Sequence, residues 1–263
     1  MKPLVFKNKI KNRLMLDMSW LSNIDMSDIP EIKNKSIQMG NRSYKVSELF
    51  QVTGEDCNNI KILKSNSYLV NIGNDLKYKT ICIEGDAGIG LAKNMNSGTV
   101  ILKGNASEAA CSGMKGGSVY IYGNAGNRLC CLPTGKNEGI LDGFIYVQKN
   151  VGSDSIARMR RGNIIIGGNI GNNSCYELIS GSITILGKIG KSFCVNAKRG
   201  TIFVKDSSIA KNYIKASNTD LTFYNFYRIN INKLINKRII NSKKPLRYFG
   251  TKKERKLVEL FVI

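Results

Sequence analysis

The chain has 263 residues, a formal net charge of +21, 42% hydrophobic residues and no histidine. Its length fits one large or two small domains, and its hydrophobic content excludes a globally disordered chain. The absence of histidine excludes a Ser-His-Asp or Cys-His triad, a His-ligated zinc or iron site and imidazole acid–base catalysis.

The N-terminus, from Met1 to Lys7, is not followed by an apolar region of the kind found in signal peptides. No apolar run approaches the roughly 18 residues that a membrane-spanning helix needs. We therefore expect a soluble, cytoplasmic protein without a membrane partner. The seven cysteines include no Cys-x-x-Cys pair, so we expect neither a disulfide framework nor a metal site.

Residues 1–56 carry no internal repeat, and we expect them to form an N-terminal cap segment. Residues 57–210 are glycine-rich and repetitive. A glycine opens each repeat, at steps of 19 residues apart from one step of 26 that contains a seven-residue insertion near 131–137. The opening glycines are Gly98, Gly117, Gly143, Gly162, Gly181 and Gly200.

The second and fourth residues after each opening glycine are apolar, as in Val100 and Leu102 or Ile183 and Ile185. This alternation is typical of a strand with one buried face. One such unit cannot bury its apolar side alone, but stacked units can. The pattern predicts an all-β fold: a right-handed parallel β-helix with about 19 residues per coil, spaced at about 4.8 Å.

Stacking of this kind also predicts ladders of identical residues. Asn105, Asn124, Asn150 and Asn169 share one position and could hydrogen-bond along the stack. Cys111, Cys130, Cys175 and Cys194 share another, which we interpret as small apolar fillers of a tight corner rather than a metal or redox site.

The third residue after each glycine should point outward, yet several are apolar. This stripe predicts either a subunit interface or a surface that the chain's own terminal segments cover. The residues of the predicted interface are Ile101, Tyr120, Tyr146, Ile165 and Phe203.

Residues 211–263 form a basic C-terminal segment that we expect to be partly helical, with a helix between Asp220 and Asn241. Between Arg228 and Lys256 the one acidic residue is Glu254. A further basic cluster lies within the repeats and suggests an anionic partner. Its residues are Arg158, Arg160, Arg161, Lys198 and Arg199.

Catalytic motifs are weak in this sequence. Gly85–Gly90 has the order G-x-x-G-x-G, which is not a dinucleotide-binding fingerprint, and Pro133–Asn137 lacks the spacing of a P-loop. The acidic residues of the repeats share no position on neighbouring units, which argues against a carbohydrate-cleaving enzyme. No aromatic-interleaved motif or recognition helix favours nucleic acid as a partner. We predict no catalytic residue on this chain.

The repeat Gly113–Gly126 resembles the glycine repeats of the C-type subunit of formylmethanofuran dehydrogenase, which we call the glycine-repeat subunit. Met159–Gly162, Lys198–Ile202 and Leu49–Gly54 are similar to further segments of that subunit. Pro245–Gly250 resembles the tail of its bacterial version, the glycine-repeat subunit of the formyltransferase/hydrolase complex.

This resemblance implies a non-catalytic scaffold of a complex in one-carbon metabolism. Its partners would be an amidohydrolase-like subunit and either a formyltransferase or a molybdenum/tungsten subunit. The formyl carrier would be methanofuran or a bacterial analogue with a polyglutamate tail, which Arg158, Arg160, Arg161, Lys198 and Arg199 could guide. The alternatives are the similar structural domain of glutamate synthase, in an amidotransferase system, and a basic nucleic-acid-binding module.

Overall fold

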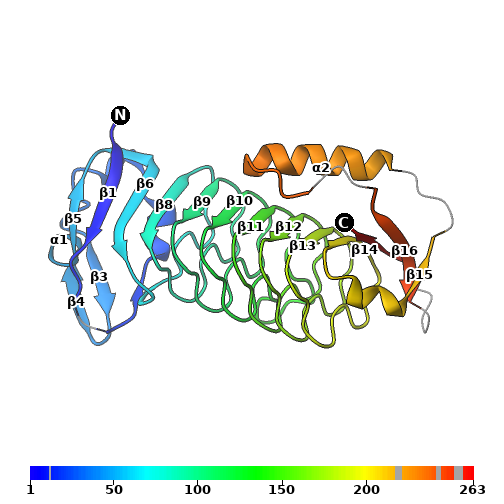
Figure 1. Cartoon of the computed structure of the whole chain (residues 1–263). Coiled ribbons are helices and arrows are strands. Elements are labelled where there is room, and N and C mark those ends of the chain that lie inside the picture. The colour runs from blue at the N-terminus through cyan, green and yellow to red at the C-terminus, as the bar shows by residue number, and fades with distance from the viewer. Residues whose placement is uncertain (12, 217–220, 241–243, 252–256) are drawn as a thin grey trace.

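The computed structural model describes residues 1–11, 13–216, 221–240, 244–251 and 257–263. The protein is mostly β, as predicted, and its repeats lie side by side along one axis (Figure 1). Its main feature is a 13-stranded sheet in the order β15-β16-β17-β14-β13-β12-β11-β10-β9-β8-β6-β1-β5. Among the described residues, no helix is long and apolar enough to cross a membrane.

The centre of this sheet is a continuous run of parallel strands, in which each repeat contributes one strand. Neighbouring strands pair without a shift through the repeats, so that Val119 lies beside Val100 on one side and Ile145 on the other. The strands are β1 (Pro3–Asn8), β6 (Asp56–Ser65), β8 (Thr80–Gly85), β9 (Thr99–Leu102), β10 (Ser118–Ile121), β11 (Phe144–Val147), β12 (Asn163–Ile166), β13 (Ser182–Ile185), β14 (Arg199–Val204) and β17 (Leu257–Val262).

Antiparallel strands complete the sheet at both ends. β5 (Phe50–Thr53) pairs with β1, while β16 (Leu246–Thr251) pairs with β17 and then with β15 (Tyr213–Lys215). The N-terminal part also contains the short helix α1 (Val46–Leu49) and a second sheet in the order β4-β3-β2-β7. The strands of that sheet are β2 (Leu16–Asp17), β3 (Ser36–Met39), β4 (Arg42–Lys45) and β7 (Leu69–Val70).

The hydrophobic core lies inside the stacked repeats. The alternating residues expected to point inward are fully buried, including Val100, Leu102, Ile183 and Ile185. The predicted asparagine ladder is confirmed. The side-chain oxygen of Asn105 accepts hydrogen bonds from the backbone and side-chain amides of Asn124, at 2.9 and 3.0 Å.

The predicted right-handed parallel β-helix is wrong, because regular strand pairing occurs on one side of the repeats alone. Each repeat contributes one strand to a single open sheet, whose edges are β5 and β15. On the other sides the described repeats meet through isolated bridges, such as Ala87 with Ala106 and Ala106 with Ala125. The chain is thus organised around one large, mostly parallel sheet that does not close into a barrel.

The physical reason lies in the backbone that follows each turn. Cys130 has a φ of 57° and Arg128, two residues earlier, has a φ of 61°. Such left-handed residues interrupt an extended strand. Their amides also bond in opposite directions, because Cys130 N donates to Ala110 O of the preceding repeat and Arg128 N to Ser153 O of the following one. This stretch therefore links the repeats without forming strands.

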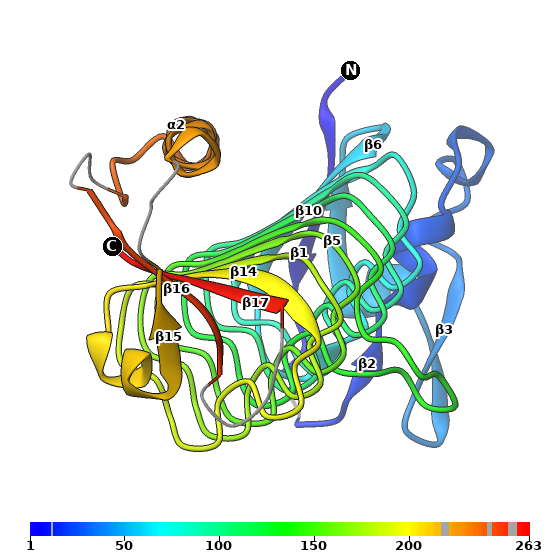
Figure 2. The same cartoon turned by 90° about the vertical axis from the view of Figure 1, so that its right-hand side faces the viewer.

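Helix α2 (Thr222–Ile235) lies across the outer face of the sheet (Figures 1 and 2). It buries Tyr224, Tyr227 and Ile231 in a second hydrophobic cluster that includes Ile165 and Phe203 of the sheet. The Tyr227 hydroxyl is 3.1 Å from the hydroxyl of Thr184 on β13. Burial raises the pKa of Tyr227 to about 12, although the hydrogen bond with Thr184 opposes this shift.

Candidate anion-binding site

A row of corresponding residues precedes the strands of successive repeats. Hydrogen bonds between the repeats fix this row: Lys115 N donates to Met95 O at 2.8 Å, and Lys198 N donates to Leu178 O at 2.7 Å. The row consists of Lys115, Leu141, Arg160, Ile179 and Lys198. At a spacing of about 4.8 Å per strand, its two lysines are roughly 19 Å apart. The row can therefore place positive charge along a considerable length of the molecule.

The five predicted cations meet in one pocket at the C-terminal part of this row, which we call the basic pocket. Its volume is about 400 Å³. The lining residues are Asn137, Glu138, Arg158, Arg160, Arg161, Ile179, Ser180, Lys198 and Arg199. The sequence separation of Arg160 and Lys198 is two repeats, which is why stacking brings them to the same surface.

Two of these arginines already have carboxylate partners. Arg158 Nη1 lies 2.7 Å from Glu177 Oε2, and Arg160 pairs with Glu138. Within the described part of the chain, Arg161, Lys198 and Arg199 have no ion pair. Partly exposed ion pairs contribute only about 0–1 kcal/mol each. The pocket therefore retains excess positive charge and suits an anionic ligand.

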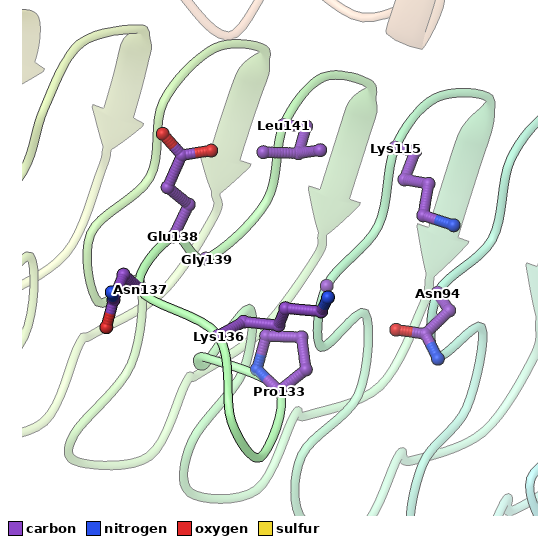
Figure 3. Close-up of a pocket in the computed structure, with 9 residues that line it drawn as sticks. Asn94, Lys115, Pro133, Lys136, Asn137, Glu138, Gly139 and Leu141 are labelled. Carbon is purple, nitrogen blue, oxygen red and sulfur yellow. The ribbon is translucent and has the colours of Figure 1, made fainter.

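A second pocket, the insertion pocket, adjoins the first and has a volume of about 430 Å³ (Figure 3). The two pockets are neighbours because Asn137 and Glu138 line both. Lys115 and Lys136 add positive charge here, and in Figure 3 Lys136 extends beside Pro133 while Glu138 lies on the side away from Lys115. The other lining residues are Asn94, Gly113, Pro133, Gly139 and Leu141.

Sequence reasoning missed Lys136, which it considered only as part of a failed P-loop. The 26-residue step between Gly117 and Gly143 could have indicated it, because an insertion in a regular stack forms a loop that projects from the surface. In the structure the insertion supplies Pro133, Lys136 and Asn137 to the pocket wall. The insertion thus extends the cationic surface from Lys198 back to Lys115.

The predicted interface stripe is divided by α2. Tyr146, Ile165 and Phe203 are buried, in the hydrophobic cluster that α2 completes. Ile101 and Tyr120 lie on β9 and β10 and remain partly exposed. Coverage by the chain's own C-terminal segment therefore accounts for the buried part, and an interface at Ile101 and Tyr120 stays a prediction.

The cysteines of the predicted ladder lie inside the stacked repeats. Cys111, Cys130, Cys175 and Cys194 are free and buried. Burial raises the pKa of the Cys130 and Cys175 thiols well above the ordinary value. Both thiols therefore stay protonated and unreactive at neutral pH. Across the described ranges, no three His, Cys, Asp or Glu residues lie close enough to hold a metal ion.

Comparison with known proteins gives a family and a fold. A family model described as the GXGXG motif matches residues 65–258. No curated protein matches the chain. A solved structure is similar over 98% of both chains, with a TM-score of 0.81 and 22% sequence identity. It is the crystal structure of the formyltransferase/hydrolase complex from Methylorubrum extorquens in complex with methylofuran.

Proposed function

The chain belongs to the GXGXG motif family, and we propose that it is the glycine-repeat scaffold subunit of a formyltransferase/hydrolase complex. The observation that carries this proposal is the fold similarity over 98% of both chains to a structure of such a complex. The flanking segments that resemble the glycine-repeat subunit, including Leu49–Gly54 and Pro245–Gly250, support the same assignment.

In this proposal the formyl chemistry belongs to partner subunits. The partners are an amidohydrolase-like subunit and a formyltransferase, with a molybdenum/tungsten subunit in place of the latter in the related dehydrogenase. This chain contributes a surface between them. Its lack of histidine agrees with a structural role, because histidine is the side chain that most often serves as a general acid or base.

We propose further that the basic pocket guides the anionic tail of a methylofuran-like cofactor. A polyglutamate tail presents repeated carboxylates, and the row presents cations at Lys115, Arg160 and Lys198 over roughly 19 Å. Each exposed pair would contribute about 1 kcal/mol or less. Contacts of this strength hold the tail near the surface, yet allow it to move between active sites on the partner subunits.

Co-expression with the candidate partner subunits tests the assignment to a complex. We expect one assembly of fixed stoichiometry by size-exclusion chromatography with light scattering. Metal analysis then separates the two types of complex, since zinc alone indicates the hydrolase, whereas molybdenum or tungsten with iron–sulfur indicates the dehydrogenase. Failure of this chain to join the assembly would refute the proposal.

The role of the basic pocket can be tested in the assembled complex with R161E/R199E. We expect the KM for a long-tailed cofactor to rise at least several-fold, and the KM for a tail-less analogue to stay the same. The effect should weaken at high salt, because exposed charges are then screened. Lys149→Glu, an exposed charge reversal outside both pockets, is the matched control. Unchanged kinetics with the long tail would argue against the guiding role.

A further inference from the structure

Helix α2 is apolar on two opposite sides. One side carries Tyr224, Tyr227 and Ile231, which are at most 6% exposed against the sheet. A helix turns by about 100° per residue, which places Phe226 and Ile229 nearly opposite this buried side. They are 66% and 56% exposed.

The exposed apolar surface extends along the helix. Phe223 and Leu234, which are 45% and 54% exposed, lie on one side of the helix, between Phe226 and the buried Tyr227. A helix that is apolar around most of its circumference is normally buried on all of these sides. Four large apolar side chains exposed on one helix therefore indicate a surface that another molecule covers. We define Phe223, Phe226, Ile229 and Leu234 as the outer face of α2.

The helix and the residues that follow it carry charge of a single sign. The sequence from Leu221 to Lys253 contains no Asp or Glu, and Lys233 and Lys237 are exposed on or just after the helix. A second copy of this chain would bring the same basic surface and a net charge of +21 against it. Like-charge contact of this kind opposes self-association.

We propose that the outer face of α2 docks into an apolar groove of a different, acidic protein, whose Asp and Glu side chains surround the groove. Phe226 and Ile229 would be the central anchors, as large side chains at the centre of an interface usually contribute most of the binding energy. The exposed lysines would pair with the surrounding carboxylates and increase the association rate. This inference does not depend on the proposed function.

Photo-crosslinking identifies the occupant. The full chain is expressed in the cells that naturally produce it, with p-benzoylphenylalanine in place of Phe226. The control carries the same residue in place of Tyr176, which is 41% exposed on a repeat. The protein crosslinked at position 226 is identified by mass spectrometry, purified and titrated against the full chain. We expect an acidic protein that does not crosslink at position 176.

The titration uses F226S, I229S and the control Y176S. We expect the first two variants to weaken binding at least tenfold each, with no change in melting temperature, and Y176S to bind as the wild type does. Binding should also weaken with rising salt. No crosslink at position 226, a crosslink to a second copy, or equal affinities for F226S and wild type would overturn the inference. An acidic partner from outside the proposed complex would support the inference without bearing on the proposed function, which the co-expression experiment tests.

Discussion

Replacing Phe203 by alanine should detach helix α2 from the sheet. The Phe203 ring is fully buried and stacks on Tyr227 and Phe261, with centroid distances of 4.3 and 5.1 Å, and it lies tilted against Tyr224 at 6.2 Å. Removing a buried Phe side chain costs about 3–5 kcal/mol. The strands keep their hydrogen bonds to neighbouring repeats, so the loss should fall on the docking of α2.

Native-state hydrogen exchange measures this loss directly. A 14-residue helix is marginal on its own, so its amides exchange when α2 leaves the sheet. A loss of 3–5 kcal/mol corresponds to about a hundred- to several-thousand-fold faster exchange in α2, at roughly tenfold per 1.4 kcal/mol. The amides of β10 and β11 should change much less.

Phe226→Ala is the matched control, because Phe226 lies on the same helix but is 66% exposed. It should leave the exchange of α2 close to that of the wild type. If F203A left α2 as protected as before, or accelerated exchange equally in all strands, the reasoning that α2 docks through Phe203 as a separate unit would be refuted.

Two further predictions concern single side chains. The pKa of Tyr227 lies near 12 in the folded protein and near 10 when unfolded, so its contribution to stability is complete below pH ~10 and falls by about 1.4 kcal/mol per pH unit up to pH ~12. The free energy of unfolding, measured with urea, should therefore decrease less between pH ~10 and pH ~12 in Y227F than in the wild type. Equal decreases would contradict the raised pKa of Tyr227. Asn124→Ala removes the hydrogen bond that its side-chain amide donates to Asn105 and the one that its side-chain oxygen accepts from the backbone amide of Asn150, and should cost about 0.5–1.5 kcal/mol in thermal or urea unfolding, whereas Asn137→Ala on the insertion should cost less. Equal costs would show that the ladder does not stabilise the stack.

The 19-residue repeat made the core residues and the asparagine ladder predictable from the sequence. Because residues 19 apart occupy equivalent places, Val100 and Val119 could be placed side by side in the core, and Asn105 next to Asn124 in a ladder. The same arithmetic brought Arg160 and Lys198 to one surface. These features depend on period alone, which the sequence displays directly.

The backbone between the strands was not predictable in this way. Cys130 and Arg128 have no glycine-like preference for positive φ, and their conformation depends on hydrogen bonds to the neighbouring repeats. The repeat period indicates stacking but not how many sides of each unit form paired strands, and for this reason the prediction of a β-helix was wrong. The position of α2 on the sheet was also not predictable, because the helical pattern does not indicate that Tyr227 contacts Thr184.

The antiparallel strands at the two ends of the sheet restrict how copies of this protein can combine. An open parallel edge would accept the next parallel strand from another molecule, and repetition of that step leads to fibres. Here β5 ends one side of the parallel run, while β16 and the three-residue β15 end the other. Both edges of the sheet are therefore short antiparallel strands, which disfavours end-to-end addition of further copies. With these ends in place, a longer or shorter sheet arises most directly by gain or loss of whole repeats between them.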